Sequence, residues 1–162
     1  MTSVQQSGLI TPGHVALWST TGVIEDGGAL PAAERVLASG RSYNFNTVLD
    51  QPITIPQRIT AFQLTGILVA NASVSLTTAA GGFYPAANKS GTPIVEAAQT
   101  YSMLTNNTLI LRATLSSLGQ NTRFSASNLS SIANFLAIWL SLTTPQGSLA
   151  TADVYLLGID LT

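Results

Sequence analysis

The chain of 162 residues contains no cysteine and a single histidine. Without cysteine, neither a disulfide nor a thiolate metal site can form. His14 alone cannot build the sites with several imidazoles that dominate zinc chemistry, and the Pro12-Gly13 turn before it favours a hydrogen-bonding role there. The sequence therefore predicts no bound metal and no cofactor.

Charged side chains are also scarce, at 8 % of residues where about 25 % is usual. The six Lys and Arg residues are scattered and form no basic stripe, so we expect no nucleic acid partner. A net charge of −1 gives copies of the chain little electrostatic protection against association. Two interpretations stay open: an extracellular β domain with an uncharged polar surface, and a subunit of a permanent assembly, which we favour.

Long apolar runs of the kind that cross membranes are missing as well. No run approaches the eighteen or so residues of a spanning helix. The N-terminus lacks the basic and apolar regions of a signal peptide. We therefore expect no membrane contact and no export by an ordinary signal.

The sequence contains no pattern that predicts an active site. The adjacent Glu25 and Asp26 lie in a Gly-rich turn, where solvated carboxylates are expected rather than a catalytic pair. A Ser-His-Asp triad would have to use His14, but no G-x-S-x-G motif is present. Neither Gly27-Gly28 nor Gly81-Gly82 opens a helix after a strand, which argues against a phosphate-binding loop. We expect that the protein is not an enzyme.

Two apolar runs, residues 135–142 and 153–161, dominate the C-terminal part of the chain. Each has the length of a strand, and the turn formers Pro145 and Gly147 lie between them, so the pattern predicts a hairpin. Alternate residues of a strand point to opposite faces, and in both runs both faces are largely apolar. Such a hairpin needs a second sheet above it and, by our hypothesis, a neighbouring subunit behind it.

The chain from residue 42 onward is otherwise typical of β structure. Residues 94–104 fit a short helix or an irregular strand equally well. In the run 108–115 the odd-numbered apolar residues would share a buried face, with Arg112 opposite, toward water or a partner acid. For Asp160, which alternates with apolar residues, we expect a partnership with Arg112 or a role at a sheet edge. Further strands are expected near residues 43–49, 58–70, 73–78 and 122–125.

This count predicts an all-β fold over residues 42–162, an antiparallel β-sandwich with the eight strands of a jelly roll. An immunoglobulin-like sandwich is the nearest alternative. Residues 1–41 have too few long apolar side chains for a core of their own, so we expect an extended N-terminal arm. Within it, residues 31–37 fit one or two helical turns with proline near the start.

Aromatic residues outside the expected strands are candidates for docking. Trp18, in an arm without its own core, is predicted to insert into a pocket of a partner. Phe83 and Tyr84 lie at the middle of a Gly-rich loop expected over residues 79–93. We expect these two rings to stack on a sugar or to dock into a neighbouring subunit.

A T-P-G-H run at residues 11–14, Trp18, and the run Val23-Ile24-Glu25-Asp26-Gly27 follow one another in the arm. The whole stretch, residues 7–28, resembles a segment near the N-terminus of structural proteins of tailed bacteriophages, including capsid-associated and fibre-type proteins. Residues 79–87 and 150–155 resemble parts of phage virion proteins more loosely. The resemblance implies a virion component. The candidate partner-docking residues are therefore Pro12, His14, Trp18, Val23 and Ile24 in the arm, with Phe83 and Tyr84 in the domain.

These observations predict a bacteriophage virion structural protein, a capsid decoration (cement) subunit assembled in the host cytoplasm. It would form a homo-oligomer, a dimer or trimer, and bind the major capsid protein or another virion protein at the capsid exterior. The alternative is a carbohydrate-binding or head-anchoring module of a phage fibre. In that case Phe83 and Tyr84 would hold a sugar with nearby Asn, Gln and Thr side chains.

Overall fold

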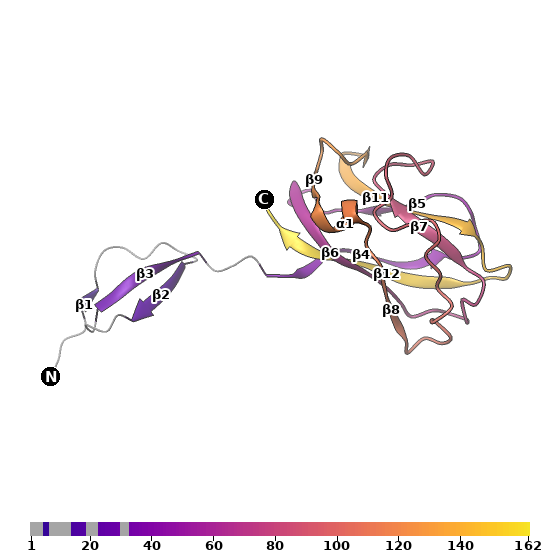
Figure 1. Cartoon of the computed structure of the whole chain (residues 1–162), viewed down its shortest axis with the longest axis horizontal. Coiled ribbons are helices and arrows are strands. Elements are labelled where there is room, and N and C mark those ends of the chain that lie inside the picture. Colours follow the sequence, from indigo (N-terminus) through magenta and orange to yellow (C-terminus); the bar gives the residue numbers. More distant parts are fainter. Residues whose placement is uncertain (1–4, 7–13, 19–22, 30–32) are drawn as a thin grey trace. The chain divides into compact units, whose positions relative to one another are not determined.

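The computed structural model describes residues 5–6, 14–18, 23–29 and 33–162, and side chains from residue 33 onward. It divides into two units, Met1–Ala32 and Ala33–Thr162. In the first unit β3 pairs with β1 in parallel and with β2 in antiparallel orientation (Figure 1). These strands are β1 (Gln5–Gln6), β2 (His14–Trp18) and β3 (Val23–Ala29). The structure describes only parts of the predicted extended arm, residues 1–41, which stays a prediction.

Two antiparallel sheets form the second unit (Figure 1). One, called the β12 sheet below, has the order β4-β12-β6-β8, with β9 also paired to β6; the other, the β11 sheet, has the order β10-β11-β5, with β7 also paired to β11. The all-β prediction is confirmed. The elements are β4 (Arg35–Asn44), β5 (Gln51–Thr54), β6 (Ala61–Ala70), β7 (Ala80–Tyr84), β8 (Ile110–Ala113), α1 (Ser117–Asn121), β9 (Arg123–Ser125), β10 (Ser131–Ile132), β11 (Phe135–Thr144) and β12 (Thr151–Asp160).

The two C-terminal apolar runs form β11 and β12, but the predicted hairpin is wrong because these strands lie in different sheets. β11 pairs with β5 and β7, and β12 pairs with β4 and β6. Residues 145–150 lead the chain from one sheet to the other, with Gly147 at a φ of 86°. The apolar pattern does not determine which strands pair. A run that is apolar on both faces can pair with the other run in one sheet, or it can pack against that run from the opposite sheet.

The core lies between the inner faces of the two sheets. Val154 and Leu156 of β12 and Ile138 and Leu140 of β11 are fully buried there. Fully burying one such side chain stabilises the fold by roughly 1.5–3 kcal/mol. The ambiguous segment 94–104 is neither a helix nor a regular strand, and it joins β7 through isolated bridges. It contributes Tyr101 to the core, and the hydroxyl of this residue donates to the Gly81 carbonyl over 3.0 Å.

Other strand predictions had mixed outcomes. The alternation predicted for 108–115 is confirmed within β8, where Ala113 is buried while Ile110 and Arg112 are exposed, but Leu109 of the predicted buried face is exposed. The strand predicted at 73–78 is wrong: Leu76 is buried, but its amide bonds to the carbonyl of Leu104 and the segment consists of bends. The helical turns predicted up to residue 37 give way to β4, which runs through residue 41, the predicted domain boundary.

Candidate functional site

The outer face of the β12 sheet carries an apolar patch. We call it the outer apolar patch. It consists of Val36, Leu68, Ile110, Tyr155 and Leu157, which surround a shallow groove of about 260 Å³. Leu157 pairs with Val36 and Tyr155 with Leu68, and opposed residues of antiparallel strands share a face. Val36 is 53 % and Ile110 66 % exposed. Contiguous exposed apolar side chains of this kind mark interaction sites.

The outer face of the β11 sheet, in contrast, is bonded to its own loops. Trp139 donates from Nε1 to the Ser130 hydroxyl over 2.7 Å. The buried Ser141 hydroxyl donates to Asp50 Oδ1 over 2.6 Å. Both C-terminal runs are apolar on both faces, but Trp139 and Ser141 of β11 are bonded to loops, whereas the apolar residues around Tyr155 and Leu157 of β12 line an open groove. The outer face of β12 is therefore the better candidate for the neighbour predicted behind the C-terminal strands.

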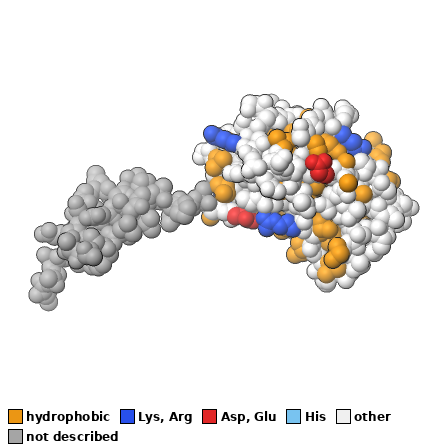
Figure 2. Space-filling model, in the orientation of Figure 1, with side chains coloured by type: hydrophobic (Ala, Val, Ile, Leu, Met, Phe, Trp, Pro, Cys, Tyr) orange, Lys and Arg blue, Asp and Glu red, His pale blue; other side chains and the backbone are white. Residues whose placement is uncertain are grey.

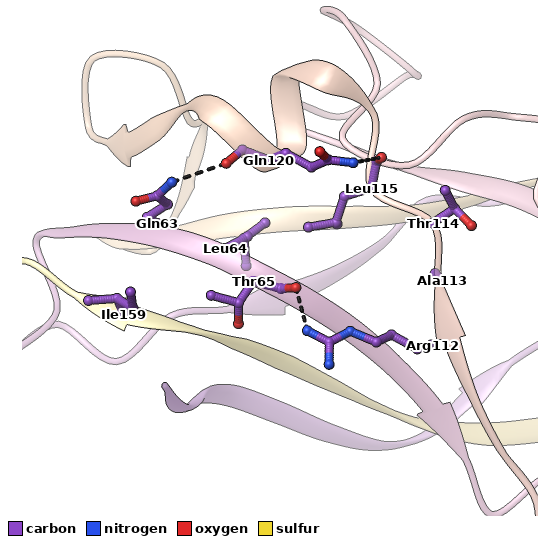
Figure 3. Close-up of a pocket in the computed structure, with 9 residues that line it drawn as sticks. All are labelled: Gln63, Leu64, Thr65, Arg112, Ala113, Thr114, Leu115, Gln120 and Ile159. Carbon is purple, nitrogen blue, oxygen red and sulfur yellow. Dashed lines mark hydrogen bonds between the residues drawn. The ribbon is translucent and has the colours of Figure 1, made fainter. Parts of the chain in front are cut away.

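A polar cleft of about 550 Å³ lies beside β6 (Figure 3). It is located where β6 has no partner strand on that side, because β8 pairs with residues 67–70 and β9 with residues 61–63. Residues 114–122, which carry α1, connect β8 to β9 across this gap. The cleft is lined by Gln63, Leu64, Thr65, Arg112, Ala113, Thr114, Leu115, Gln120 and Ile159.

Arg112 is held against the floor of this cleft. Its Nη2 donates to the Thr65 carbonyl over 2.5 Å (Figure 3). Thr65 is a β-bulge, since Leu157 and Gly158 of β12 pair with the residues on either side of it. A Cβ at Gly66 would lie 2.6 Å from Arg112 Nε, so the guanidinium rests where only glycine leaves room.

Arg112 faces both water and an acid, as predicted, but it does not form the partnership with Asp160 that was one of the two expectations for that residue. Arg112 lies 3.8 Å from Glu34, not beside Asp160, and both side chains of this pair are about half exposed. An exposed pair of this kind contributes about 1 kcal/mol or less, so Glu34 holds Arg112 only weakly. Asp160 pairs with Arg35 instead. Hydrogen bonds from Thr162, followed by the charges of Arg35 and Arg58, lower the pKa of Asp160.

Two glutamines complete the polar lining. Gln63 donates from Nε2 to the Gln120 carbonyl over 3.0 Å, and Gln120 donates from Nε2 to the Leu115 carbonyl over 2.9 Å (Figure 3). Their Oε1 atoms have no partner among the described residues, so each amide offers an acceptor. Ser116 caps α1 by accepting from the Gly119 amide and so fixes the backbone that carries Gln120.

The loops at one end of the sandwich form a third surface. Gln146 joins two of them, because its Oε1 accepts from the amides of Thr78 and Ala79. The loop that contains Leu104 is connected to them as well, because the Leu104 carbonyl accepts a hydrogen bond from the Leu76 amide. Met103 is 73 % and Leu149 80 % exposed on these loops. This loop end therefore presents large apolar side chains without a covering layer among residues 33–162.

The structure separates the residues predicted to dock a partner. Phe83 and Tyr84 do not lie in a loop: they end β7, and at 0 % and 5 % exposure they belong to the interior. Phe83 packs inside because β7 lies between β11 and the segment that bridges it at Val95. His14 and Trp18 lie in β2, and Val23 and Ile24 in β3, but their side chains and Pro12 are outside the described residues.

Sequence reasoning missed the cleft residues Gln63 and Gln120. They are 57 positions apart, and neither belongs to a motif. They meet only because β8 and β9 leave a gap along the same edge of β6. The only feature of the sequence that pointed to the cleft was the predicted position of Arg112 on the exposed face of its strand.

Comparison with protein-family models, with curated proteins and with solved structures gives no significant match to this chain. Among the residues that the structure describes, no group of three His, Cys, Asp or Glu side chains is arranged to hold a metal ion. No helix in that part of the chain has the length and apolar character needed to span a bilayer.

Proposed function

We propose that the protein is a structural component of a bacteriophage virion, a decoration subunit that binds the capsid exterior and associates with copies of itself. The observation that carries this proposal is the outer apolar patch on a protein with very little charge. Figure 2 shows a surface on which Lys, Arg, Asp and Glu are sparse and apolar side chains recur. Such a surface favours permanent contacts, because few charges need to be desolvated when copies meet.

In this proposal a second copy covers the outer apolar patch. Charges of both signs lie beside this apolar patch, because Arg112 pairs with Leu68 across β6 and β8 and Glu34 lies 3.8 Å from Arg112. An apolar centre with a mixed charged border is self-complementary, as a contact related by two-fold symmetry requires. Residues at the loop end, Met103 and Leu149, would then contact the capsid.

The strand order supports a jelly roll for the domain. The first and last strands of the second unit, β4 and β12, are adjacent, and β6 and β8 follow in the same sheet, with β9 also paired to β6. The opposite sheet contains β5, β11 and β7, with the irregular segment 94–104 beyond β7. This alternation of the chain between two sheets is what the two Greek keys of a jelly roll produce, and virus capsid proteins and lectins use that fold.

Self-association is tested by light scattering of the purified full chain. We expect a dimer or trimer at micromolar concentration, and Ile110→Glu should shift it to the monomer because it adds a charge to the patch. Leu149→Glu is the matched control, as it changes an apolar residue on the loop end that is at least as exposed as Ile110. A monomeric parent protein, or an Ile110→Glu variant that keeps the oligomer, would contradict the role of the patch.

Capsid binding is tested by mixing the protein with capsids of the source phage prepared without it and measuring co-sedimentation. Leu149→Glu and Met103→Glu should weaken binding directly, and Ile110→Glu should weaken it through lost avidity. A variant lacking residues 2–28 tests the predicted arm, and undiminished coating would remove the arm from the proposal. No binding by the parent chain would refute the decoration role.

A second candidate function, a carbohydrate-binding module of a phage fibre, is favoured by the polar cleft. The predicted sugar-stacking residues, Phe83 and Tyr84, are buried and do not serve it. Arg112, Gln63 and Gln120 supply polar groups at a concave site instead. Jelly rolls also occur in lectins, so the same fold is compatible with both candidates.

A further inference from the structure

We propose that the polar cleft binds an acidic saccharide, a sugar ring that carries a carboxylate. This inference gives the ligand class for the second candidate function and does not depend on the capsid role. It can be measured on the isolated protein, whereas decoration is scored on capsids. Failure of one is therefore distinguishable from failure of the other.

Arg112 is the group that would receive the carboxylate. A guanidinium has five N–H donors in a rigid fork that matches the two oxygens of a carboxylate. One of these nitrogens, Nη2, is used by the Thr65 carbonyl, and the only carboxylate of the described residues within 4 Å is Glu34 at 3.8 Å. The contacts with Thr65 and Gly66 keep the guanidinium in place, so little side-chain entropy would be lost on binding.

The other lining residues suit the hydroxyls of a sugar. Gln63 and Gln120 have their amide nitrogens bonded to carbonyls, which leaves both Oε1 atoms as acceptors for hydroxyl donors. Thr114, an exposed residue of the lining, adds a hydroxyl that can donate or accept. Acceptors of this kind give a sugar partners that a simple carboxylate such as acetate would not use.

Size and charge point to the same class. Ile159 gives the cleft an apolar wall on which the C–H face of a sugar ring can pack. About 550 Å³ lies within the usual range of ligand sites, roughly 300–1,000 Å³. None of the residues that line the cleft is acidic, so a bound carboxylate would meet no negative charge in the lining.

The experiment is a nuclear magnetic resonance titration of the full chain with glucuronate, glucose and acetate. We expect glucuronate to bind roughly tenfold or more tightly than glucose, because hydrogen bonds between a guanidinium and a carboxylate are stronger than those between neutral groups. Acetate should also bind more weakly than glucuronate. The side-chain amide signals of Gln63 and Gln120 should shift with glucuronate and saturate.

Variants connect the binding to Arg112. Arg112→Gln should reduce the affinity for glucuronate to that for glucose, whereas Arg41→Gln, which changes an exposed arginine of β4, should leave it unchanged. Thr114→Asp, at an exposed site, should weaken glucuronate binding by adding a negative charge to the lining. Circular dichroism confirms that each variant is folded. Equal affinity for glucuronate and glucose, equal affinity for acetate, no binding at all, or full binding by Arg112→Gln would overturn the proposal.

Discussion

Arg112 lies directly over Gly66, with its Nε 2.6 Å from the position that a Cβ on residue 66 would occupy. The clashing atoms are at the far end of a flexible side chain, so Gly66→Ala is expected to move Arg112 rather than the sheet. The loss of stability should be small, below about 1 kcal/mol, because alanine also restricts the unfolded chain. If the cleft binds glucuronate, this variant should bind it several-fold more weakly. Denaturant unfolding and the glucuronate titration measure the two effects, and unchanged affinity would show that Gly66 does not position Arg112.

Gly82→Ala provides the opposite case. A Cβ on Gly82 would lie 2.2 Å from the backbone carbonyl oxygen of Val95, in the segment that bridges β7. Backbone cannot rotate away as a side chain can, so the two segments must separate. We expect destabilisation of about 1–3 kcal/mol or more in urea unfolding. A cost no larger than that of Gly66→Ala would contradict the close approach.

The sequence could predict which residues of a strand are exposed, but it could not predict which strands pair. The alternation in 108–115 correctly predicts that Arg112 lies on an exposed face, because a two-residue period determines which side chains share a face. The same rule predicts the inner and outer faces of β12. It could not assign β11 and β12 to different sheets, since alternation contains no information about which strands pair.

The prediction that Phe83 and Tyr84 lie in a loop is wrong for a related reason. The Gly-Gly pair before them suggested a loop, but Gly82 serves close packing of β7 on the Val95 segment and not a turn. Long-range contacts decided the outcome, as they did for the cleft, where Gln63 and Gln120 are brought together by the gap between β8 and β9. Short-range patterns do not encode such contacts.

Thr65→Val is predicted to stabilise the protein. The Oγ1 atom of Thr65 is buried and has no hydrogen-bond partner in the described part of the chain. An unsatisfied buried hydroxyl costs about 1–3 kcal/mol, and valine has nearly the same shape. We expect a gain of about 1 kcal/mol in the free energy of unfolding, measured with urea at an unchanged slope. Thr65→Ser is the control, since it keeps the hydroxyl and removes a methyl group. Equal or lower stability of the valine variant would show that the hydroxyl is satisfied in solution.

The tyrosines predict a loss of stability at alkaline pH. Burial raises the pKa of Tyr43 to about 12 and raises the pKa of Tyr101 further. For Tyr84, burial followed by the charges of Glu96 and Asp50 also raises the pKa. Because these pKa values in the folded state exceed the unfolded value of about 10, the contribution to stability is fully present below about pH 10. It is lost as the pH rises toward about 12 and beyond.

The measurement combines phenolate absorbance with urea unfolding over this pH range. Absorbance of the folded protein should rise later than that of the urea-unfolded chain, and the unfolding midpoint should fall above about pH 10. Tyr43→Phe should flatten part of this pH dependence while costing the hydrogen bond to the Pro52 carbonyl, 2.9 Å long. Ionisation of Tyr43, Tyr84 and Tyr101 near pH 10 in a protein that remains folded would contradict the burial of these rings, above all of Tyr101 within the core.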